Sequence, residues 1–566
     1  MASRRFVYLL SAVCLVGCGG SGIRKFPLRE PLWRDPDEHS FTEKPDEYFS
    51  PFGWDAADQT IFRPISRFFA VDPAGQAVNV NALDEVPDSS WFENRISRAP
   101  FSPAALATGP CEGPAIDPKG PWLVVGAKPD GANPGFMVKD AQGKKYLLKF
   151  DGVVEGPRAT AADVIGSRLY HAAGYFVPCN RVTYFERGVL GIDPEATADE
   201  GGDEVKLELR HVEKVLAKAQ RTADGRFRAN ASLLVEGKPL GPWTYQGTRS
   251  DDPNDVVPHE DRRELRGGRV LAAWLNHFDA REQNTLGTWI EARGGGYVRH
   301  YMIDFGDCLG SIWEPPLLGR RIGHAYYLDV GDILEDFLTL GLVRRPWDKA
   351  RFGASGTVFG YFDTEPFEPE SWKPGYPNPA FSRMKEHDAA WMARIIAEFR
   401  DEHLREVIKT ASFGRALLDQ ELFRILAGRR DKILRRYLAK LSPLARPVVL
   451  AESGVARLCV KDLALFAGIA RASTRVYGAR GFVGDELQAT PPIELAAAAA
   501  PRVCARLPAV PGASPARPGY LIMDLSSSSE GEQKPGPLRA HLYHLGGNDY
   551  RLAGLERPED DEPPSP

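Results

Sequence analysis

The chain has 566 residues, more than a single hydrophobic core organises, so two to four domains are expected. Its composition, 43% hydrophobic and 26% charged, is that of a packed globular protein and excludes a disordered chain. The net charge of −5 is small and the basic residues form no tail or stripe, which argues against nucleic acid as a partner.

The N-terminus predicts an export signal. Arg4 and Arg5 precede an apolar run, Phe6–Val16, that is too short to span a membrane as a stable anchor. The sequence LVGC that ends at Cys18 resembles the bacterial lipobox, in which the cysteine is lipid-modified and becomes the first mature residue. This resemblance implies a cell-envelope lipoprotein, anchored by its lipid to the inner or outer membrane and either periplasmic or surface-exposed. The alternative is a plain signal peptide, residues 1–18, with an incidental cysteine.

The next segment, residues 19–110, predicts an extended N-terminal arm. It is rich in Pro, Asp, Phe and Trp and shows no clean period. We therefore expect it to lie along a folded surface, held by aromatic anchors, and not to form a catalytic unit.

Regular structure is expected from Trp122 onward. Apolar runs alternate with turn residues, which predicts three antiparallel strands at 123–125, 136–139 and 145–150. A helix with Thr160 as a cap should follow the third strand.

Residues 190–260 are less regular. Residues 206–220 read as a helix or as a strand plus a helix, and residues 226–247 as a hairpin around Gly237. A helix then approaches His277, with an inward stripe at helical spacing formed by Val270, Ala273, Trp274 and His277.

The C-terminal half divides into helices and then strands. Large apolar residues repeat at helical spacing over 379–441, which predicts a helical block. Short β-type runs after Pro443 predict a small C-terminal β domain over 443–557. The tail, 558–566, is acidic and Pro-rich, and disorder is expected there.

Five cysteines follow the predicted signal, an odd number that leaves at least one thiol free in an oxidising compartment. CxxC spacing is absent from the sequence, which argues against zinc. Cys459 and Cys504 are candidates for a disulfide, and unpaired buried thiols are the alternative. Cys308 is expected to be free.

Two charged residues in the first half suit phosphate binding. Lys149 ends the third predicted strand, where its ammonium can face the phosphates of a nucleotide. Asp163, on the following helix, can pair with that lysine, and Glu155 is the rival for this role. The alternative for each residue is an ordinary solvated surface charge.

Polar residues with catalytic potential follow the helix that approaches His277. In the sequence LNHFDAREQN, Asp279 would accept a proton from an attacking hydroxyl, and Arg281 could neutralise a transferring phosphoryl group. Asn284 would bind a metal ion through its amide oxygen. The alternative is a polar loop without chemistry.

A predicted hairpin, with strands at 286–290 and 297–303, returns the chain to Asp304 in the sequence YMIDFG. Asp304 should then lie near Asn284, and two oxygen ligands in one cavity suit Mg²⁺. The Gly-rich loop 126–135, which includes Gly131, could cover the phosphates, although it is not a clean GxGxxG and the chain has no Walker A motif.

This order of residues resembles the protein-kinase-like superfamily over about residues 121–440. It is more similar to atypical bacterial members, such as HipA-type and CotH-type kinases, and to the phosphatidylinositol 3/4-kinase-like group. The resemblance implies an α+β, two-lobed core. Its small lobe, over 111–265 with an insertion, would be an antiparallel sheet plus a helix, and its larger lobe, over 266–442, mainly helical.

The resemblance also implies cofactors and roles. Mg²⁺ and ATP, or another nucleotide, would bind between the lobes. Lys149 matches the phosphate-binding lysine, Asp163 its helix partner and Asp279 the catalytic aspartate, while Asn284 and Asp304 match the metal ligands. The sequence departs from the family at Asn276-His277-Phe278-Asp279, which replaces His-Arg-Asp, and in lacking a clear Ala-Pro-Glu, so substrate recognition does not carry over.

We therefore expect an exported, membrane-anchored phosphotransferase acting on a hydroxyl of a protein or small molecule. Two alternatives remain: a kinase fold that has lost catalysis and serves as a binding or scaffold protein, and an envelope lipoprotein whose motifs are incidental. ATP is expected to be scarce outside the cytoplasm, which leaves the nucleotide open. The chain has no HExxH or GxSxG motif to support a zinc or serine hydrolase.

Overall fold

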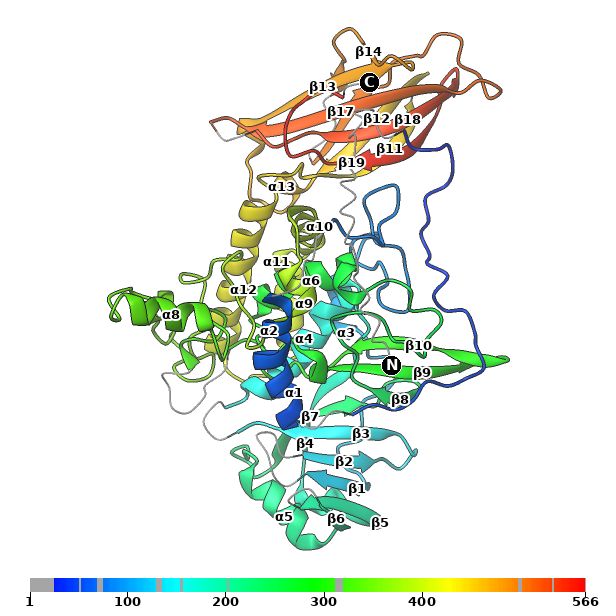
Figure 1. The fold of residues 1–566 in the computed structure, drawn as a ribbon. Helices are drawn as coiled ribbons and strands as arrows, with labels where there is room; N and C mark the ends of the chain where they lie inside the picture. The colour runs from blue at the N-terminus through cyan, green and yellow to red at the C-terminus, as the bar shows by residue number, and fades with distance from the viewer. Residues whose placement is uncertain are drawn as a thin grey trace, which may run out of the picture.

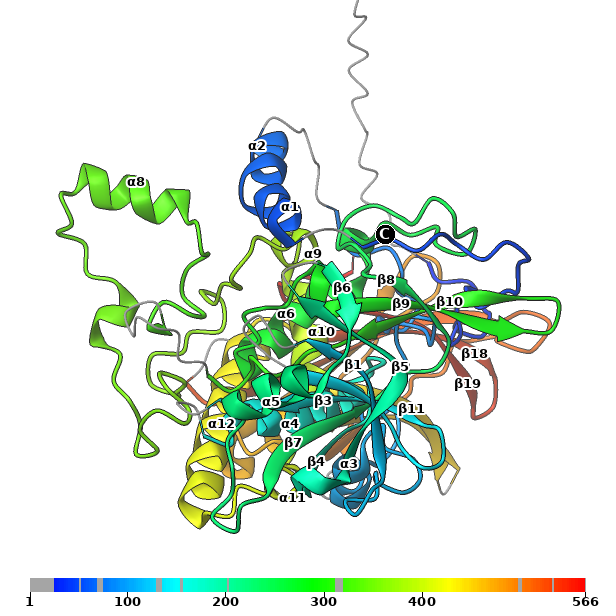
Figure 2. The ribbon, with the colours of Figure 1, turned by 90° about the horizontal axis from the view of Figure 1, so that it is seen from below.

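The computed structural model describes residues 25–49, 52–68, 75–128, 135–152, 156–200, 203–310, 319–452, 454–496, 501–531 and 534–564. The predicted signal peptide with Cys18, the loop residue Gly131 and the rival acid Glu155 lie outside these ranges. Over the described ranges the architecture is α+β, with four sheets arranged around and beyond a helical body (Figures 1 and 2). In the same ranges, no helix has the length and apolar character needed to cross a membrane.

The first sheet has the strand order β4-β7-β3-β2-β1-β5-β6 and is antiparallel except for the β1–β5 pair. Its core forms because alternate residues of each strand point to one face, as Tyr146, Leu148 and Phe150 do in β3. The strands are β1 Trp122–Lys128, β2 Gly135–Lys139, β3 Lys145–Phe150, β4 Asn180–Phe185, β5 Leu190–Glu200, β6 Asp203–Lys206 and β7 Phe227–Leu233. Two helices lie between these strands in the chain: α4, Arg158–Ala173, follows β3, and α5, Leu209–Lys218, follows β6.

The three expected strands are present as β1 to β3, and β1 runs further than expected, to Lys128. Thr160 is not a cap, because it lies inside α4 and instead donates its N–H and its hydroxyl to Asp151, at 2.9 and 2.8 Å.

The hairpin expected around Gly237 is also wrong. β7 inserts between β3 and β4, whereas β8, Lys238–Gly241, pairs with β9 in another sheet. Both edges of β7 are therefore taken by strands remote in sequence.

The helical body holds the largest core, to which α4 and the helices of the second half contribute. Val270, Ala273 and Trp274 are buried in α6 as expected, and His277 is buried just beyond the helix end, after Asn276 in a left-handed conformation. The elements are α6 Arg263–Leu275, β9 Thr285–Ala292, β10 Gly295–Met302, α8 Val330–Leu338, α9 Pro379–Ser382, α10 Glu386–Ile396, α11 Asp401–Lys409 and α12 Ala416–Tyr437.

The N-terminal segment follows the surface from the C-terminal sheets to the β9–β10 hairpin (Figure 1). The Phe26 N–H donates to the Tyr520 hydroxyl at 3.3 Å, and Phe41 forms a backbone bridge with Gly296. The segment also contributes Trp91 and other side chains to the main core, so it is more than a surface wrap. Its short helices are α1 Phe52–Ala57, α2 Arg63–Phe68 and α3 Pro103–Thr108.

The C-terminal strands form two sheets at one end of the molecule (Figure 1). A disulfide joins Cys459 of β12 to Cys504 of β16, which confirms that candidate pair. The elements are β11 Leu444–Glu452, β12 Val455–Asp462, α13 Leu463–Phe466, β13 Arg475–Val483, β14 Gln488–Ala489, β15 Leu495–Ala496, β16 Arg502–Arg506, β17 Gly519–Ser529, β18 Leu538–Gly546 and β19 Asp549–Glu556.

The acidic tail, expected to be disordered, has defined contacts over residues 558–564. Asp561 forms ion pairs with Arg480 and with Lys534, and Arg539 donates to the Glu562 carbonyl at 2.7 Å. The acids of the tail thus find basic partners on the sheet, which composition alone does not reveal.

Candidate active site

A lysine between two aspartates forms the centre of the candidate site. Lys149 Nζ lies 2.6 Å from Asp304 Oδ1 and 3.6 Å from Asp163 Oδ2. The lysine comes from β3, Asp163 from α4, and Asp304 from the residues that follow β10. Asp163, the expected partner of Lys149, is therefore beside it, and so is Asp304, which is 155 positions away in sequence.

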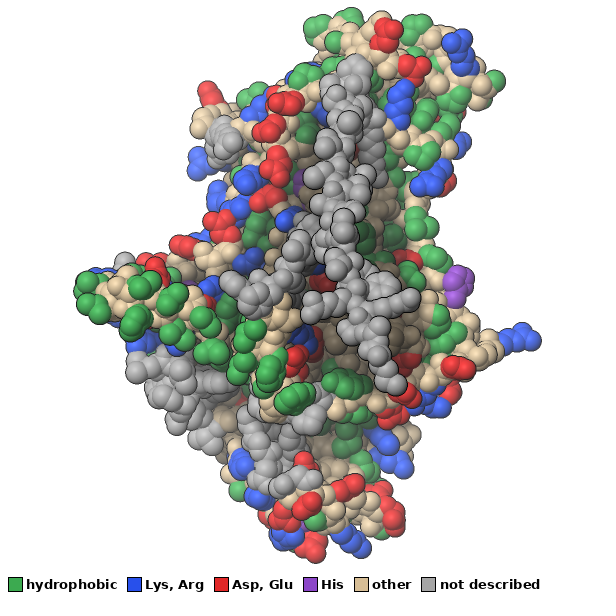
Figure 3. All heavy atoms as spheres, viewed as in Figure 1, with side chains coloured by type: hydrophobic (Ala, Val, Ile, Leu, Met, Phe, Trp, Pro, Cys, Tyr) green, Lys and Arg blue, Asp and Glu red, His purple; other side chains and the backbone are tan. Residues whose placement is uncertain are grey.

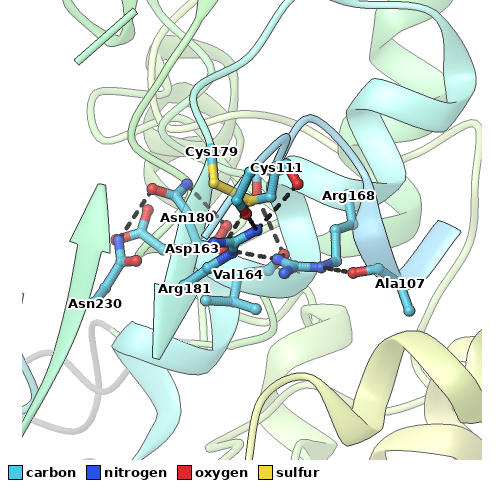
Figure 4. The surroundings of a disulfide bond; sticks show 11 residues. Ala107, Cys111, Asp163, Val164, Arg168, Cys179, Asn180, Arg181 and Asn230 are labelled. Carbon is cyan, nitrogen blue, oxygen red and sulfur yellow. Dashed lines mark hydrogen bonds between the residues drawn. A yellow bond between two sulfur atoms is a disulfide. The ribbon is translucent and has the colours of Figure 1, made fainter. Parts of the chain in front are cut away.

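Asp163 is held in place by buried amides. Its carboxylate accepts hydrogen bonds from the Phe305 N–H at 2.9 Å and from Asn230 Nδ2 at 3.0 Å. Asn180 Nδ2 donates to the Asp163 carbonyl at 3.1 Å (Figure 4). The neighbouring Cys179 is disulfide-bonded to Cys111, so a covalent link secures the chain where β4 begins. The acid on α4 is consequently part of a rigid frame.

Asp304 has an unusual backbone conformation. Its φ is +59°, a left-handed value that is uncommon for residues other than glycine and that recurs at functional sites. The turn after it is fixed from α4, because Arg158 Nη1 donates to the carbonyls of Gly306 at 2.7 Å and Cys308 at 3.0 Å. Cys308 is buried and its thiol is free, as expected.

Phe305 is fully buried between α4 and the segment after α6. Its side chain touches Gly166, where a Cβ would come within 2.7 Å of it, and its ring lies 5.5 Å from that of His277. Only a glycine permits this approach, since any side chain at 166 would displace the ring. The packing sets the position of Asp304 immediately before it.

The predicted catalytic residues lie together in the loop after α6. Asn284 Nδ2 donates to Asp279 Oδ2 at 2.7 Å, and Arg281 Nε lies 2.9 Å from Asp279 Oδ1. The Ile303 N–H donates to the Asn284 carbonyl at 3.0 Å, which places this loop next to Asp304. The hairpin thus returns the chain as expected.

Arg281 is engaged by groups that the sequence did not indicate. Its Nη1 lies 3.8 Å from Asp55 of α1, and its guanidinium stacks over the Tyr376 ring at 4.9 Å. Beside it, Arg63 of α2 forms an ion pair with Glu282 at 2.5 Å. The N-terminal segment therefore contacts the loop after α6, and Arg281 lies within ion-pair distance of two carboxylates, of Asp55 and Asp279.

The ionisable groups of the site influence one another. Burial disfavours the charged form of Lys149, but Asp163 and Asp304 outweigh it and raise its pKa. Burial and the nearby Asp304 raise the pKa of Asp163, whereas the short contact with Lys149 outweighs burial and lowers the pKa of Asp304. The two acids differ because Lys149 is 1 Å closer to Asp304.

Asp279 has a pKa raised to about 6. Burial is the main cause, and Asp304 and Asp55 add to it, while Arg281 and the hydrogen bond from Asn284 oppose it. Burial, more than the neighbouring acids, therefore holds the pKa of Asp279 above its ordinary value.

Among the described residues, no group of three or more His, Cys, Asp or Glu side chains could by itself hold a metal ion. The expected Mg²⁺ ligands are one amide oxygen, of Asn284, and one carboxylate, of Asp304. Two protein oxygens fit Mg²⁺ when phosphate oxygens and water complete the octahedron. The donor chemistry of these two oxygens fits this ion.

Asn230, Asp55 and Tyr376 were missed by the sequence reasoning. Asn230 lies opposite Lys149 in the β3–β7 ladder, a pairing set by tertiary structure. Asp55 and Tyr376 lie far in sequence from Arg281 and carry no local motif. Only the inserted position of β7 and the course of the N-terminal segment reveal them.

The fold and the site define an α+β protein with a partly buried Lys–Asp–Asp cluster beside an Asp–Asn loop. Comparison of the chain with protein-family models, with curated proteins and with solved structures finds no match.

Proposed function

We propose that this protein is a kinase-like phosphotransferase that uses Mg²⁺ and a nucleoside triphosphate. The observation that carries the proposal is the position of Lys149, within ion-pair distance of both Asp163 and Asp304. The Asp279–Asn284 pair is tied to the same strand end as Asp304. A two-lobed kinase-like core, with β1 to β3 and α4 over the helical body, is the proposed architecture.

Each residue has a defined part in the proposed reaction. Lys149 would bind phosphate oxygens while Asp163 holds its ammonium. Asp279, with a pKa of about 6, is mostly a carboxylate at neutral pH and can accept the proton of an attacking hydroxyl. Asn284 and Asp304 would hold Mg²⁺, which supplies charge neutralisation on the phosphates. For Arg281 to reach a phosphoryl group, its contact with Asp55 would have to open.

The proposed location is the cell envelope, with the lipid on Cys18 as membrane anchor. Two observations support it: the N-terminal lipobox-like sequence and the disulfides Cys111–Cys179 and Cys459–Cys504, which suit an oxidising compartment. The nucleotide and the acceptor, a protein or a small molecule, are then those available in that compartment.

The test is radiolabelled transfer with residues 19–566, which are the mature chain without the lipid-modified Cys18. Nucleoside triphosphates labelled in the γ position are incubated with Mg²⁺ and envelope extract or water as acceptor. Label transfer or release is expected from the wild type, with a loss of at least about 100-fold in Asp279→Asn, the contribution of a general base. Glu195→Gln, an exposed acid on β5, is the matched control and should be unchanged. Equal rates for Asp279→Asn and the wild type would exclude Asp279 as the base.

A second candidate function, a protein-binding scaffold, is favoured by α8. This helix projects from the body with an apolar stripe facing outward: Val330, Ile333, Leu334, Phe337 and Leu338 are 52–76% exposed (Figures 2 and 3). On its acidic side, Arg345 forms ion pairs with Asp332, Glu335 and Asp336. An outward stripe with this spacing suits an apolar groove in a partner protein.

Crosslinking separates this candidate from the first. A photoreactive amino acid at Phe337 should give one defined protein adduct in intact cells, and Ile333→Ser in the same chain should remove it. The same group at Leu417, an exposed residue on α12, is the control. Adducts to lipid alone, or none, would contradict a scaffold role for α8.

A further inference from the structure

A cavity lies away from the Lys149 cluster, where three parts of the chain meet. It has a volume of about 330 Å³ and is lined by the N-terminal segment, by α10 and by the strands β11 and β19 with their flanking residues. Figure 1 shows these parts meeting between the helical body and the C-terminal sheets. The volume lies within the range of small-molecule sites.

The charged lining is predominantly basic. Four arginines and two glutamates are among the described lining residues, including Arg394 from α10, Arg446 from β11 and Arg557 after β19. Arg394 and Arg557 are 5% and 3% exposed. Arg446 forms an ion pair with Glu398 at 3.0 Å, and the same glutamate forms a second ion pair with Lys461 at 2.9 Å. One carboxylate thus serves two cations on this side.

The carboxylate of Asp84 is a shared hydrogen-bond acceptor for two of the arginines that line the cavity, Arg394 and Arg557. It accepts from Arg394 at 3.0 Å, from Arg557 at 3.2 Å and from Arg263 of α6. Arg394 Nη1 is buried and has no hydrogen-bond partner within the part of the chain that the structure describes. Arg394 is one of the residues that line the cavity, and a buried donor without an acceptor is costly, so an acceptor that reached this guanidinium would be favoured.

Burial is the main influence on the charged groups of the wall. Burial and the neighbouring Arg394 lower the pKa of Arg557 to about 9, although Asp84 and Glu85 oppose this. Burial also raises the pKa of Glu85, against the effect of Arg394. A bound anion would therefore stabilise the charged form of these poorly solvated arginines.

The rest of the wall is apolar and aromatic. Trp391 and Ile395 of α10 face the cavity together with Trp33, Leu463 and Leu555 from three other segments. The Arg98 guanidinium stacks over the Trp33 ring at 4.5 Å. The wall of this cavity therefore offers a ligand both guanidinium groups and apolar side chains.

We propose that this cavity binds an amphipathic organic anion, in which a carboxylate or phosphate is joined to an apolar group. The anion would accept hydrogen bonds from Arg394 and Arg446, and the apolar group would lie against Trp391 and Leu555. Because the wall comes from three parts of the chain, the ligand would stabilise their assembly. The site is independent of the proposed phosphotransfer.

Calorimetric titration of the mature chain tests the proposal with four probes: octanoate, octyl phosphate, octanol and inorganic phosphate. Binding of octanoate or octyl phosphate is expected, and whichever binds more tightly identifies the head group. Octanol and inorganic phosphate should each bind at least about tenfold more weakly, because each lacks one half of the ligand.

Two variants locate the binding. Arg446→Met removes a partly exposed donor and should weaken binding of the anionic probe about tenfold. Ser97→Phe, which fills the cavity from its accessible side, should abolish it. Arg424→Met, an exposed arginine on α12, is the control. Absence of binding by both anionic probes, equal binding of octanol, or binding unchanged in both cavity variants would overturn the proposal.

Discussion

Lys149 is the residue on which the candidate site depends, because it neutralises two acids that would otherwise repel each other. Removing it leaves Asp163 and Asp304 facing each other with little solvent around Asp163. Removing one partner of a buried ion pair typically costs about 3–5 kcal/mol, so Lys149→Met should lower the free energy of unfolding by up to this amount.

A double-mutant cycle checks this role of Lys149. Urea denaturation of Lys149→Met, Asp304→Asn and the double variant should show that the second change restores part of the stability lost by the first. The coupling free energy should be at least about 1 kcal/mol. Additive effects would mean that the ion pair is not formed in solution.

Asp37 should make the stability of the protein depend on pH, through its contacts within the N-terminal segment. Its carboxylate accepts from the Ser90 N–H at 3.0 Å and from the Ser90 hydroxyl at 2.8 Å. Burial raises its pKa to about 6, against these hydrogen bonds. The folded state therefore binds a proton more tightly than the unfolded state, and Asp37 lowers stability as the pH rises from about 4 to about 6.

The measurement is the free energy of unfolding at pH 4.5 and pH 7.5 in the wild type and in Asp37→Asn. Between pH 4.5 and pH 7.5 the free energy of unfolding should fall less in the variant than in the wild type. The difference between the two falls should be about 3 kcal/mol at most. Comparing the two proteins removes the contribution of other acids. Parallel pH profiles would contradict a raised pKa at Asp37.

At the residue scale, the sequence was informative where the chemistry is local. Asp279 and Asn284 are five positions apart, and the hairpin that follows returns Asp304 to them. Asn230 and Asp55 could not be predicted, because their places depend on the insertion of β7 and on the course of the N-terminal segment.

At the scale of elements, the spacing of apolar residues predicted the helices that bury one continuous face. The helices α6, α10, α11 and α12 carry their apolar residues at helical spacing and were expected. The hairpin around Gly237 was wrong because strand pairing is not local: β7 pairs with β3 and β4 instead. The contacts of the tail also depend on tertiary structure, since Arg480 and Arg539 lie on distant strands.

Helix α8 allows a direct test of an element. Phe337 is 76% exposed, so Phe337→Ala should change the free energy of unfolding by no more than about 0.5 kcal/mol. Leu418→Ala, at a fully buried position of α12, should cost about 2–5 kcal/mol. Urea denaturation measures both. A large cost at Phe337 would show that the apolar stripe is covered in solution.

At the scale of the molecule, the C-terminal sheets are stabilised by a covalent link. The Cys459–Cys504 disulfide closes a loop with a sequence separation of 45 residues. Replacing both cysteines with serine should cost about 2–4 kcal/mol. Denaturation of the oxidised wild type beside the double variant measures this, and non-reducing mass spectrometry of peptides checks the pairing. A reduced pair in protein secreted to an oxidising compartment would contradict the structure.

The proposed phosphotransferase activity requires that the Lys149 cluster bind a nucleotide with Mg²⁺. The most direct measurement is the thermal midpoint of the mature chain with each nucleoside triphosphate, with and without Mg²⁺, beside Asp304→Ala and the control Glu195→Gln. At a ligand concentration about 100 times Kd, binding should stabilise the wild type and the control by about 2.7 kcal/mol, and only when Mg²⁺ is present. Asp304→Ala should lose this shift. A wild type whose midpoint does not change with any nucleotide would contradict the proposed phosphotransferase.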